Sequence, residues 1–266
     1  MRAAGATGDL RLYEFRSRIF RNTRLLRVWL PPGYDDAANE NNHYPVLYLN
    51  DGQNLFESSS AFGGVEWQVD EAADRLIKAG TVPPTVIVGI DNTGKDRMRE
   101  YLPYRSMNPM ILRAQGRYYP DFLVKEVMPF IEQNFRVATR PEETGLGGSS
   151  LGGLIALYTV ISRPGIIGKL LIESPSLWAG NRQILKDSRA VRIWPEKIFL
   201  ACGTAEAPSV EKSRSVVENV KELAAIARRA VLSEKRLRVV IQEGARHTEA
   251  AWAERFPEAL TFLFGN

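Results

Sequence analysis

The chain alternates short apolar runs with longer segments in which apolar residues recur at helical spacing. The short runs are rich in β-branched and aromatic residues and end at glycine, proline or aspartate, which is typical of strands. We predict strands over residues 10–20, 25–30, 44–50, 86–91, 144–147, 170–176, 197–203 and 237–242. Helices are predicted over residues 67–79, 120–135, 154–161, 210–231 and 252–264.

The order of these elements predicts the fold class. Residues 21–24 join the first two strands as a hairpin. The nearly continuous apolar run at 44–50 has the composition of a strand buried on both faces of a parallel sheet. Strands that alternate with helices imply a mainly parallel central sheet with helices on both faces. We therefore expect a single α/β domain over residues 1–266, with a β-hairpin at its N-terminus.

A glycine-rich turn at residues 144–154 supplies the first candidate for chemistry. Gly148 and Gly152 flank Ser150 in the pattern G-x-S-x-G, and an apolar helix is predicted directly afterwards. A serine on a sharp strand-to-helix turn has a strained backbone, and side chains two residues away would collide with one another. Glycine at both positions removes those side chains. The pattern therefore predicts Ser150 as a nucleophile at the amino end of a helix and indicates an α/β-hydrolase fold.

The histidines test this prediction, because an α/β-hydrolase places its nucleophile, acid and histidine in that order along the chain. The chain has two histidines, His43 and His247. His43 precedes Ser150 and lies in a loop that enters a strand, at the wrong end of the sheet. His247 follows the last predicted strand, which is the position that the fold requires. We therefore predict His247 as the catalytic base.

The acid is expected in the loop after the strand at 197–203. Glu206 provides a carboxylate there, which would accept the imidazole N–H and stabilise the imidazolium. Glu211 in the same segment and Glu173 at the end of the preceding strand are alternatives. A carboxylate at the start of a helix, where the dipole favours it, is the competing structural role for Glu206.

An oxyanion hole needs two backbone N–H groups, one from the residue after the nucleophile and one from the loop after an earlier strand. Leu151 follows Ser150 and supplies the first group. Gln53, in the turn that ends the strand at 44–50, is predicted to supply the second. Gly52 would let the backbone approach the ester carbonyl, and Asp51 is expected to shape the turn.

Composition narrows the function classes. The 35 basic and 31 acidic residues among 266 are interspersed and leave a net charge of +4, which argues against nucleic-acid binding. No apolar run approaches the roughly 20 residues of a membrane-spanning helix. The single cysteine, Cys202, excludes an internal disulfide and a cysteine metal site, and its apolar neighbours predict a core position. Residues 1–9 lack the apolar centre of a secretory signal, so we expect a cytoplasmic protein.

Several motifs together resemble the Putative esterase family, which includes esterase D, feruloyl esterases and enterochelin-esterase-like hydrolases. The motifs are PPGY at 31–34, DGQNLF at 51–56, VGID at 88–91 followed by Arg97 and Glu100-Tyr101, GGSSLGGL at 147–154, SPSLW at 174–178 and GTAE at 203–206. The resemblance implies a cofactor-free and metal-free serine esterase that acts through an acyl-enzyme on small acyl or aromatic, feruloyl-type esters. It supports Ser150, His247 and Glu206, together with the Gln53 and Leu151 amides. Many relatives have aspartate in place of Glu206.

Residues 92–118 form a long segment without clear periodicity, and such segments are more often functional than idle. Arg97 and Tyr101 in this segment are expected to contact the substrate. So are three aromatic residues near the ends of strands, Phe56, Trp67 and Trp178. The expected partner is a small-molecule ester, and the chain is expected to be a monomer or a homodimer. Acyl transfer to a sugar or lipid acceptor, and ligand binding without catalysis, are the alternative functions.

Overall fold

The structure is a computed structural model that describes residues 5–105, 114–230 and 233–265. Within these ranges, eight strands form one sheet in the order β1-β2-β4-β3-β5-β6-β7-β8. The strands are β1 (Asp9–Arg16), β2 (Thr23–Leu30), β3 (Val46–Asn50), β4 (Val86–Ile90), β5 (Thr144–Ser149), β6 (Lys169–Glu173), β7 (Lys197–Ala205) and β8 (Leu237–Arg246). β1, β2 and β4 are antiparallel neighbours, and every pairing from β4 to β8 is parallel. This is the α/β-hydrolase fold that the sequence predicts.

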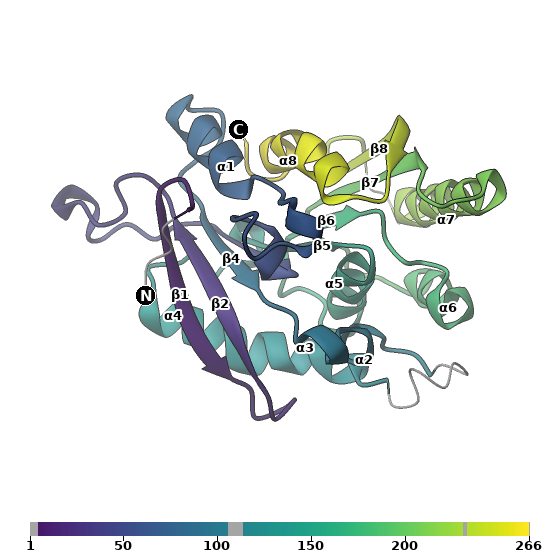
Figure 1. The fold of residues 1–266 in the computed structure, drawn as a ribbon, viewed down its shortest axis with the longest axis horizontal. Helices are drawn as coiled ribbons and strands as arrows, with labels where there is room; N and C mark the ends of the chain where they lie inside the picture. Colours follow the sequence, from purple (N-terminus) through teal and green to yellow (C-terminus); the bar gives the residue numbers. More distant parts are fainter. Residues whose placement is uncertain (1–4, 106–113, 231–232, 266) are drawn as a thin grey trace.

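Helices cover both faces of the sheet (Figure 1). The α-helices are α1 (Val69–Lys78), α2 (Arg97–Tyr101), α3 (Tyr119–Phe122), α4 (Met128–Asn134), α5 (Leu151–Ser162), α6 (Ala179–Ser188), α7 (Val210–Arg229) and α8 (Glu249–Phe264). α1 and α8 pack on one face, where Leu47 and Leu49 of β3 point. α3 to α7 pack on the other face, where Val46 and Tyr48 point. Because side chains alternate along a strand, each buried strand contributes to both cores.

The structure refines several predicted boundaries. β1 ends at Arg16, and the Ser17 amide donates to the Asn22 carbonyl at 2.9 Å, so the hairpin turn begins earlier than predicted. The helix at 120–135 contains a π-helical stretch, Leu123–Val127, between α3 and α4. α6 was not predicted at all. The predicted end of α7 at residue 231 lies outside the described residues, as does part of the long segment at 92–118 (residues 106–113).

The longest extension is in β8, which continues to Arg246 instead of ending at residue 242. β7 also continues to Ala205, which pairs with Arg246 after a bulge. A Cβ at Gly203 would lie 2.0 Å from the Ala245 carbonyl oxygen, so only glycine permits this close pairing. The result is that His247 leaves the sheet directly beside the end of β7.

The parallel strands bring their carboxyl ends to one edge of the sheet. Ser150 follows β5, Ser174 follows β6, Glu206 follows β7 and His247 follows β8. Residues far apart in the chain therefore meet at this edge, as in other open α/β sheets. None of the helices in the described ranges is both long and apolar enough to cross a bilayer.

Candidate active site

Ser150 occupies the turn between β5 and α5 with φ 56° and ψ −121°, a conformation that side-chain-bearing residues rarely adopt. A Cβ at Gly148 would lie 2.9 Å from the Gly152 backbone carbon and 3.0 Å from Asn50 Cβ. A Cβ at Gly152 would lie 3.0 Å from a carboxylate oxygen of Asp51. Close packing therefore accounts for both flanking glycines: Gly148 lies against the backbone of Gly152, and Gly152 lies against the Asp51 carboxylate.

Hydrogen bonds hold this turn to the neighbouring strand. The Ser150 amide donates to the Glu173 carbonyl at 2.9 Å, and the Ser176 amide donates to the Ser150 carbonyl at 3.0 Å. The Ser150 hydroxyl lies 3.3 Å from that of Ser176. The serine is thus held rigidly by its backbone, while its side chain makes one weak contact.

The strained backbone of Ser150 predicts a measurable stability difference. Ser150→Gly is expected to be more stable than Ser150→Ala by about 1–2 kcal/mol, because glycine adopts positive φ without the clash of a Cβ. Urea unfolding of the two variants measures the difference directly. Glycine substitution at Thr159, in the interior of α5, serves as the control and should destabilise the protein. Equal stability of the two Ser150 variants would contradict the strain.

Glu206 and His247 form a contact pair beside Ser150. Glu206 Oε2 lies 2.5 Å from His247 Nδ1, and the side chain of Glu206 is fully buried. Its other oxygen accepts hydrogen bonds at 2.6 Å from the Ser174 hydroxyl and from the Gly203 amide. The Trp252 indole donates to the Ser174 hydroxyl at 2.9 Å and lies edge-on to the imidazole, with ring centroids 5.1 Å apart. These contacts orient the carboxylate and the imidazole together.

The same contacts control the ionisation of Glu206. Burial acts to raise its pKa, but the hydrogen bonds from His247, Ser174 and the Gly203 amide outweigh burial and lower the pKa below its usual value of 4.5. Glu206 is therefore a carboxylate at neutral pH. An ionised partner at Nδ1 favours the tautomer in which Nε2 is free to accept a proton.

The other candidates from the sequence have different surroundings. Glu173 is buried, and its Oε2 accepts hydrogen bonds from Arg255 at 2.7 and 2.9 Å. Burial raises the pKa of Glu173 to about 7, even though Arg255 acts in the opposite direction. Glu211 is exposed in the first turn of α7, and His43 is exposed in the loop before β3. Glu206 is the carboxylate in contact with His247.

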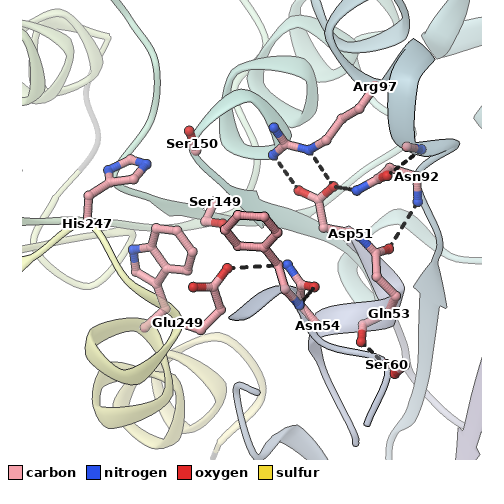
Figure 2. Close-up of a pocket in the computed structure, with 13 residues that line it drawn as sticks. Asp51, Gln53, Asn54, Ser60, Asn92, Arg97, Ser149, Ser150, His247 and Glu249 are labelled. Atoms are coloured by element: carbon pink, nitrogen blue, oxygen red, sulfur yellow. Dashed lines mark hydrogen bonds and ion pairs between the residues drawn. The ribbon is translucent and has the colours of Figure 1, made fainter. Parts of the chain in front are cut away.

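The loop after β3 is held tightly beside Ser150 (Figure 2). Asp51 adopts φ 60° and forms a two-pronged ion pair with Arg97, with both N–O distances 2.7 Å. Asn92 donates to the same carboxylate at 2.7 Å, and its backbone amide donates to the Gln53 side chain at 3.2 Å. Ser60 donates to the Gln53 carbonyl at 2.8 Å. These bonds fix the orientation of the Gln53 backbone.

Gln53 and Leu151 each lie in the first turn of a helix, where backbone amides have no acceptor within the helix. In the described ranges no other group accepts a hydrogen bond from either amide. Gly52 also packs closely on the sheet, because a Cβ there would lie 2.5 Å from the Gly89 carbonyl carbon in β4. This close packing is by itself sufficient to require glycine at position 52.

Two cavities meet at Ser150 and His247. Cavity 1, of about 670 Å³, lies beside the loop after β3, with Asn54, Arg97 and Glu249 in its wall (Figure 2). Cavity 2, of about 510 Å³, lies between α7 and the segment after β6. Ser150 and His247 line both cavities. A bond held at Ser150 can therefore have one of its two sides in each cavity.

The residues expected to contact substrate divide into two groups. Trp178 is 63% exposed and lines cavity 2, and Arg97 lines cavity 1. Phe56, Trp67 and Tyr101 are at most 2% exposed and line neither cavity. The first two belong to the core beneath α1 and α8, and Tyr101 packs beneath the Arg97 guanidinium. The structure therefore assigns these three aromatic side chains to packing, because burial removes them from the cavity walls.

Sequence reasoning missed other residues at the site. Ser174 and Ser176 line cavity 2, and Asn92, Glu249 and Trp252 line cavity 1, but none of them was predicted as a site residue. Ser174 also has a positive φ of 44°. The signal for this segment is a strained serine directly after β6, the strand that pairs with β5. This signal is a backbone angle, so it is visible in the structure but not in the sequence.

The fold and the serine turn define a hydrolase class, and comparison with known proteins identifies the family. Residues 17–263 match the family described as Putative esterase. The match covers most of the chain, so the chain belongs to this family and is a carboxylic ester hydrolase.

Named relatives cover most of the chain at low identity. This chain is 24% identical over 247 residues to YbbA of Bacillus subtilis, and the alignment covers 91% of this chain and 93% of that protein. An endo-1,4-beta-xylanase/feruloyl esterase of Xylanibacter ruminicola is 24% identical over 266 residues, which are 97% of this chain but 31% of that protein. The ferri-bacillibactin esterase BesA of Bacillus subtilis is 29% identical over 215 residues, which are 73% of this chain and 70% of that protein. The chain thus resembles both feruloyl and siderophore esterases.

A solved structure supports the fold. The siderophore hydrolase EstB from Aspergillus nidulans superimposes with a TM-score of 0.78 over 99% of this chain and 98% of that chain. The sequence identity is 19%, so this likeness concerns the fold alone.

Proposed function

We propose that this esterase cleaves its substrate through an acyl-enzyme, with Ser150 as the nucleophile, His247 as the base and Glu206 as the acid that orients it. One observation carries the proposal: the imidazole held by Glu206 at 2.5 Å opens onto the same two cavities as Ser150. A serine hydroxyl is a weak nucleophile unless an adjacent base removes its proton.

The proposed first step forms the bond between Ser150 Oγ and the ester carbonyl carbon. His247 Nε2 takes the hydroxyl proton, and the carbonyl oxygen becomes an oxyanion that accepts hydrogen bonds from the Gln53 and Leu151 amides. The bond to the alcohol oxygen then breaks, and that oxygen receives the proton from Nε2. Water repeats the same steps on the acyl-enzyme, which releases the acid and restores Ser150.

The serine side chain must turn for this step. In the described residues Ser150 has no hydrogen bond to His247, and its hydroxyl is directed to Ser176. Catalytic hydrogen bonds are often long or absent without substrate and form in the complex. Because the backbone of Ser150 is held on both sides, we expect its hydroxyl to turn toward His247 by rotation about the Cα–Cβ bond.

The two cavities support a substrate with a substantial group on each side of the ester bond. Their volumes allow an aromatic or short aliphatic acyl group on one side and a small alcohol on the other. The names of relatives, a feruloyl esterase and a ferri-bacillibactin esterase, are consistent with this class. We accordingly propose small acyl or aromatic esters as substrates.

The test combines turnover with labelling. The wild type is expected to hydrolyse p-nitrophenyl acetate, p-nitrophenyl butyrate or methyl ferulate, and a fluorophosphonate probe should modify Ser150, as located by peptide mapping. Product analysis with an added alcohol distinguishes hydrolysis from acyl transfer. Labelling without turnover would overturn the substrate class. Failure of both would overturn the serine mechanism and favour a binding protein.

A further inference from the structure

One face of α7 forms a wall of cavity 2. Lys212, Ser215, Val216 and Asn219 line this cavity, and they stand at positions i, i+3, i+4 and i+7 of the helix. Residues at these spacings lie on one side of a helix. This side lies next to the apolar side of α7, which packs on the sheet. The polar residues therefore form a built surface that faces the cavity next to Ser150.

Asn219 is the unusual member of this surface. It is 5% exposed, it lines cavity 2, and within the described part of the chain no group makes a hydrogen bond with its side-chain amide. Both polar atoms of the amide remain accessible from the cavity, and asparagine is a poor residue for a helix interior. Local rules broken without a structural gain are expected at functional sites. The amide is therefore available to a ligand in the cavity.

The remaining walls determine which ligand fits. Pro175, Ala207 and Val216 are apolar, and Trp178 stands at the mouth with 63% of its surface exposed. Such walls accept an apolar chain or a flat ring. Asn219 offers both a donor and an acceptor but no charge. A neutral hydroxyl or amide of the ligand satisfies it with one donated and one accepted hydrogen bond.

We infer that cavity 2 binds the half of the ester that is apolar along its length and carries a neutral hydroxyl or amide at its far end, which Asn219 recognises by hydrogen bonding. Asn219 is thus a specificity-determining residue. This inference rests on the proposed function, since it assumes that the ester is held at Ser150.

The experiment uses two pairs of esters that differ only in the polar tip. The acyl pair is methyl phenylpropionate and its para-hydroxyphenyl counterpart, and the alcohol pair is phenylethyl acetate and its para-hydroxyphenyl counterpart. In at least one pair, the wild type is expected to prefer the hydroxylated ester in kcat/KM by about three- to tenfold, as one neutral hydrogen bond allows. The pair that shows the preference identifies which half of the ester occupies cavity 2.

Asn219→Leu should reduce that ratio to about one, because the hydroxylated ester loses its hydrogen bond while both esters of the pair keep the same apolar contacts. It should also unfold at the same temperature as the wild type or higher, because no protein hydrogen bond is lost. Glu218→Leu, one position earlier on the exposed side of α7, should keep the wild-type ratio.

Other outcomes overturn the inference in recognisable ways. A ratio near one in the wild type for both pairs, or an unchanged ratio in Asn219→Leu, would show that Asn219 does not select the substrate. A large loss of thermal stability in Asn219→Leu, with all four esters affected equally, would show a structural role. If the wild type hydrolyses none of the esters and does not react with a fluorophosphonate, the proposed serine mechanism fails instead.

Discussion

Ser150→Ala is expected to lower kcat for p-nitrophenyl butyrate by about 10⁴–10⁶, with little change in the fold. Without the hydroxyl, no bond to the carbonyl carbon forms, and only the oxyanion amides and binding remain to assist attack by water. The variant should also fail to react with a fluorophosphonate. Steady-state kinetics and mass spectrometry of the labelled proteins measure both effects.

The chain offers a matched control at the preceding position. Ser149 is the last residue of β5, is 4% exposed, and differs from Ser150 in having ordinary strand geometry. Ser149→Ala should therefore keep its fluorophosphonate labelling and most of its activity. Loss of labelling in Ser149→Ala, with labelling retained in Ser150→Ala, would move the nucleophile by one residue and refute the assignment.

Glu206→Gln is the change with the second largest expected effect, a fall in kcat of about 10²–10⁴. The amide group has nearly the same shape as the carboxylate but lacks its charge. The amide can donate a hydrogen bond to Nδ1, which would place the imidazole proton on Nε2. A protonated Nε2 cannot act as a base. The substitution also removes the negative charge that stabilises the imidazolium in the transition state.

Two carboxylates provide the comparison for this variant. Glu211→Gln changes an exposed group in the first turn of α7 and should leave kcat within about twofold. Glu173→Gln changes a buried group paired with Arg255, so its main effect should be lower stability, seen in urea unfolding. If Glu211→Gln or Glu173→Gln reduced kcat as strongly as Glu206→Gln at equal stability, Glu206 would not be the acid.

The rigid surroundings of Ser150 explain how a marginally stable chain can hold a strained serine. Asn50 donates to the Gly152 carbonyl at 2.8 Å, which ties the end of β3 to the first turn of α5. Asp51 is held in place by its ion pair with Arg97. Strain of this kind persists only where the surrounding structure determines the backbone conformation. Contacts from several distant segments offset the strain energy of the Ser150 turn.

Local patterns in the sequence were sufficient for the fold class and for two residues of the candidate site. Ser150 was identifiable because the G-x-S-x-G pattern occupies five consecutive residues, 148–152. His247 was identifiable because the order of strands fixes which loops lie at the carboxyl edge, and one of the two histidines follows the last strand. Both predictions rest on properties that a single chain segment or the element order can express.

Tertiary structure decided what depends on contacts between distant segments. Glu206 and Glu173 both follow or end a strand near Ser150, and only the position of Arg255 on α8 shows that Glu173 is already paired. Phe56 and Trp67 are aromatic residues near strand ends, and only packing shows that they are buried. Asn219 is one of many polar residues in α7, and only the cavity beside it shows that its amide lacks a partner. The sequence determines which groups are present and the order in which the sheet presents them, but the environment of each group is a sum over neighbours from the whole chain, so the folded structure decides it.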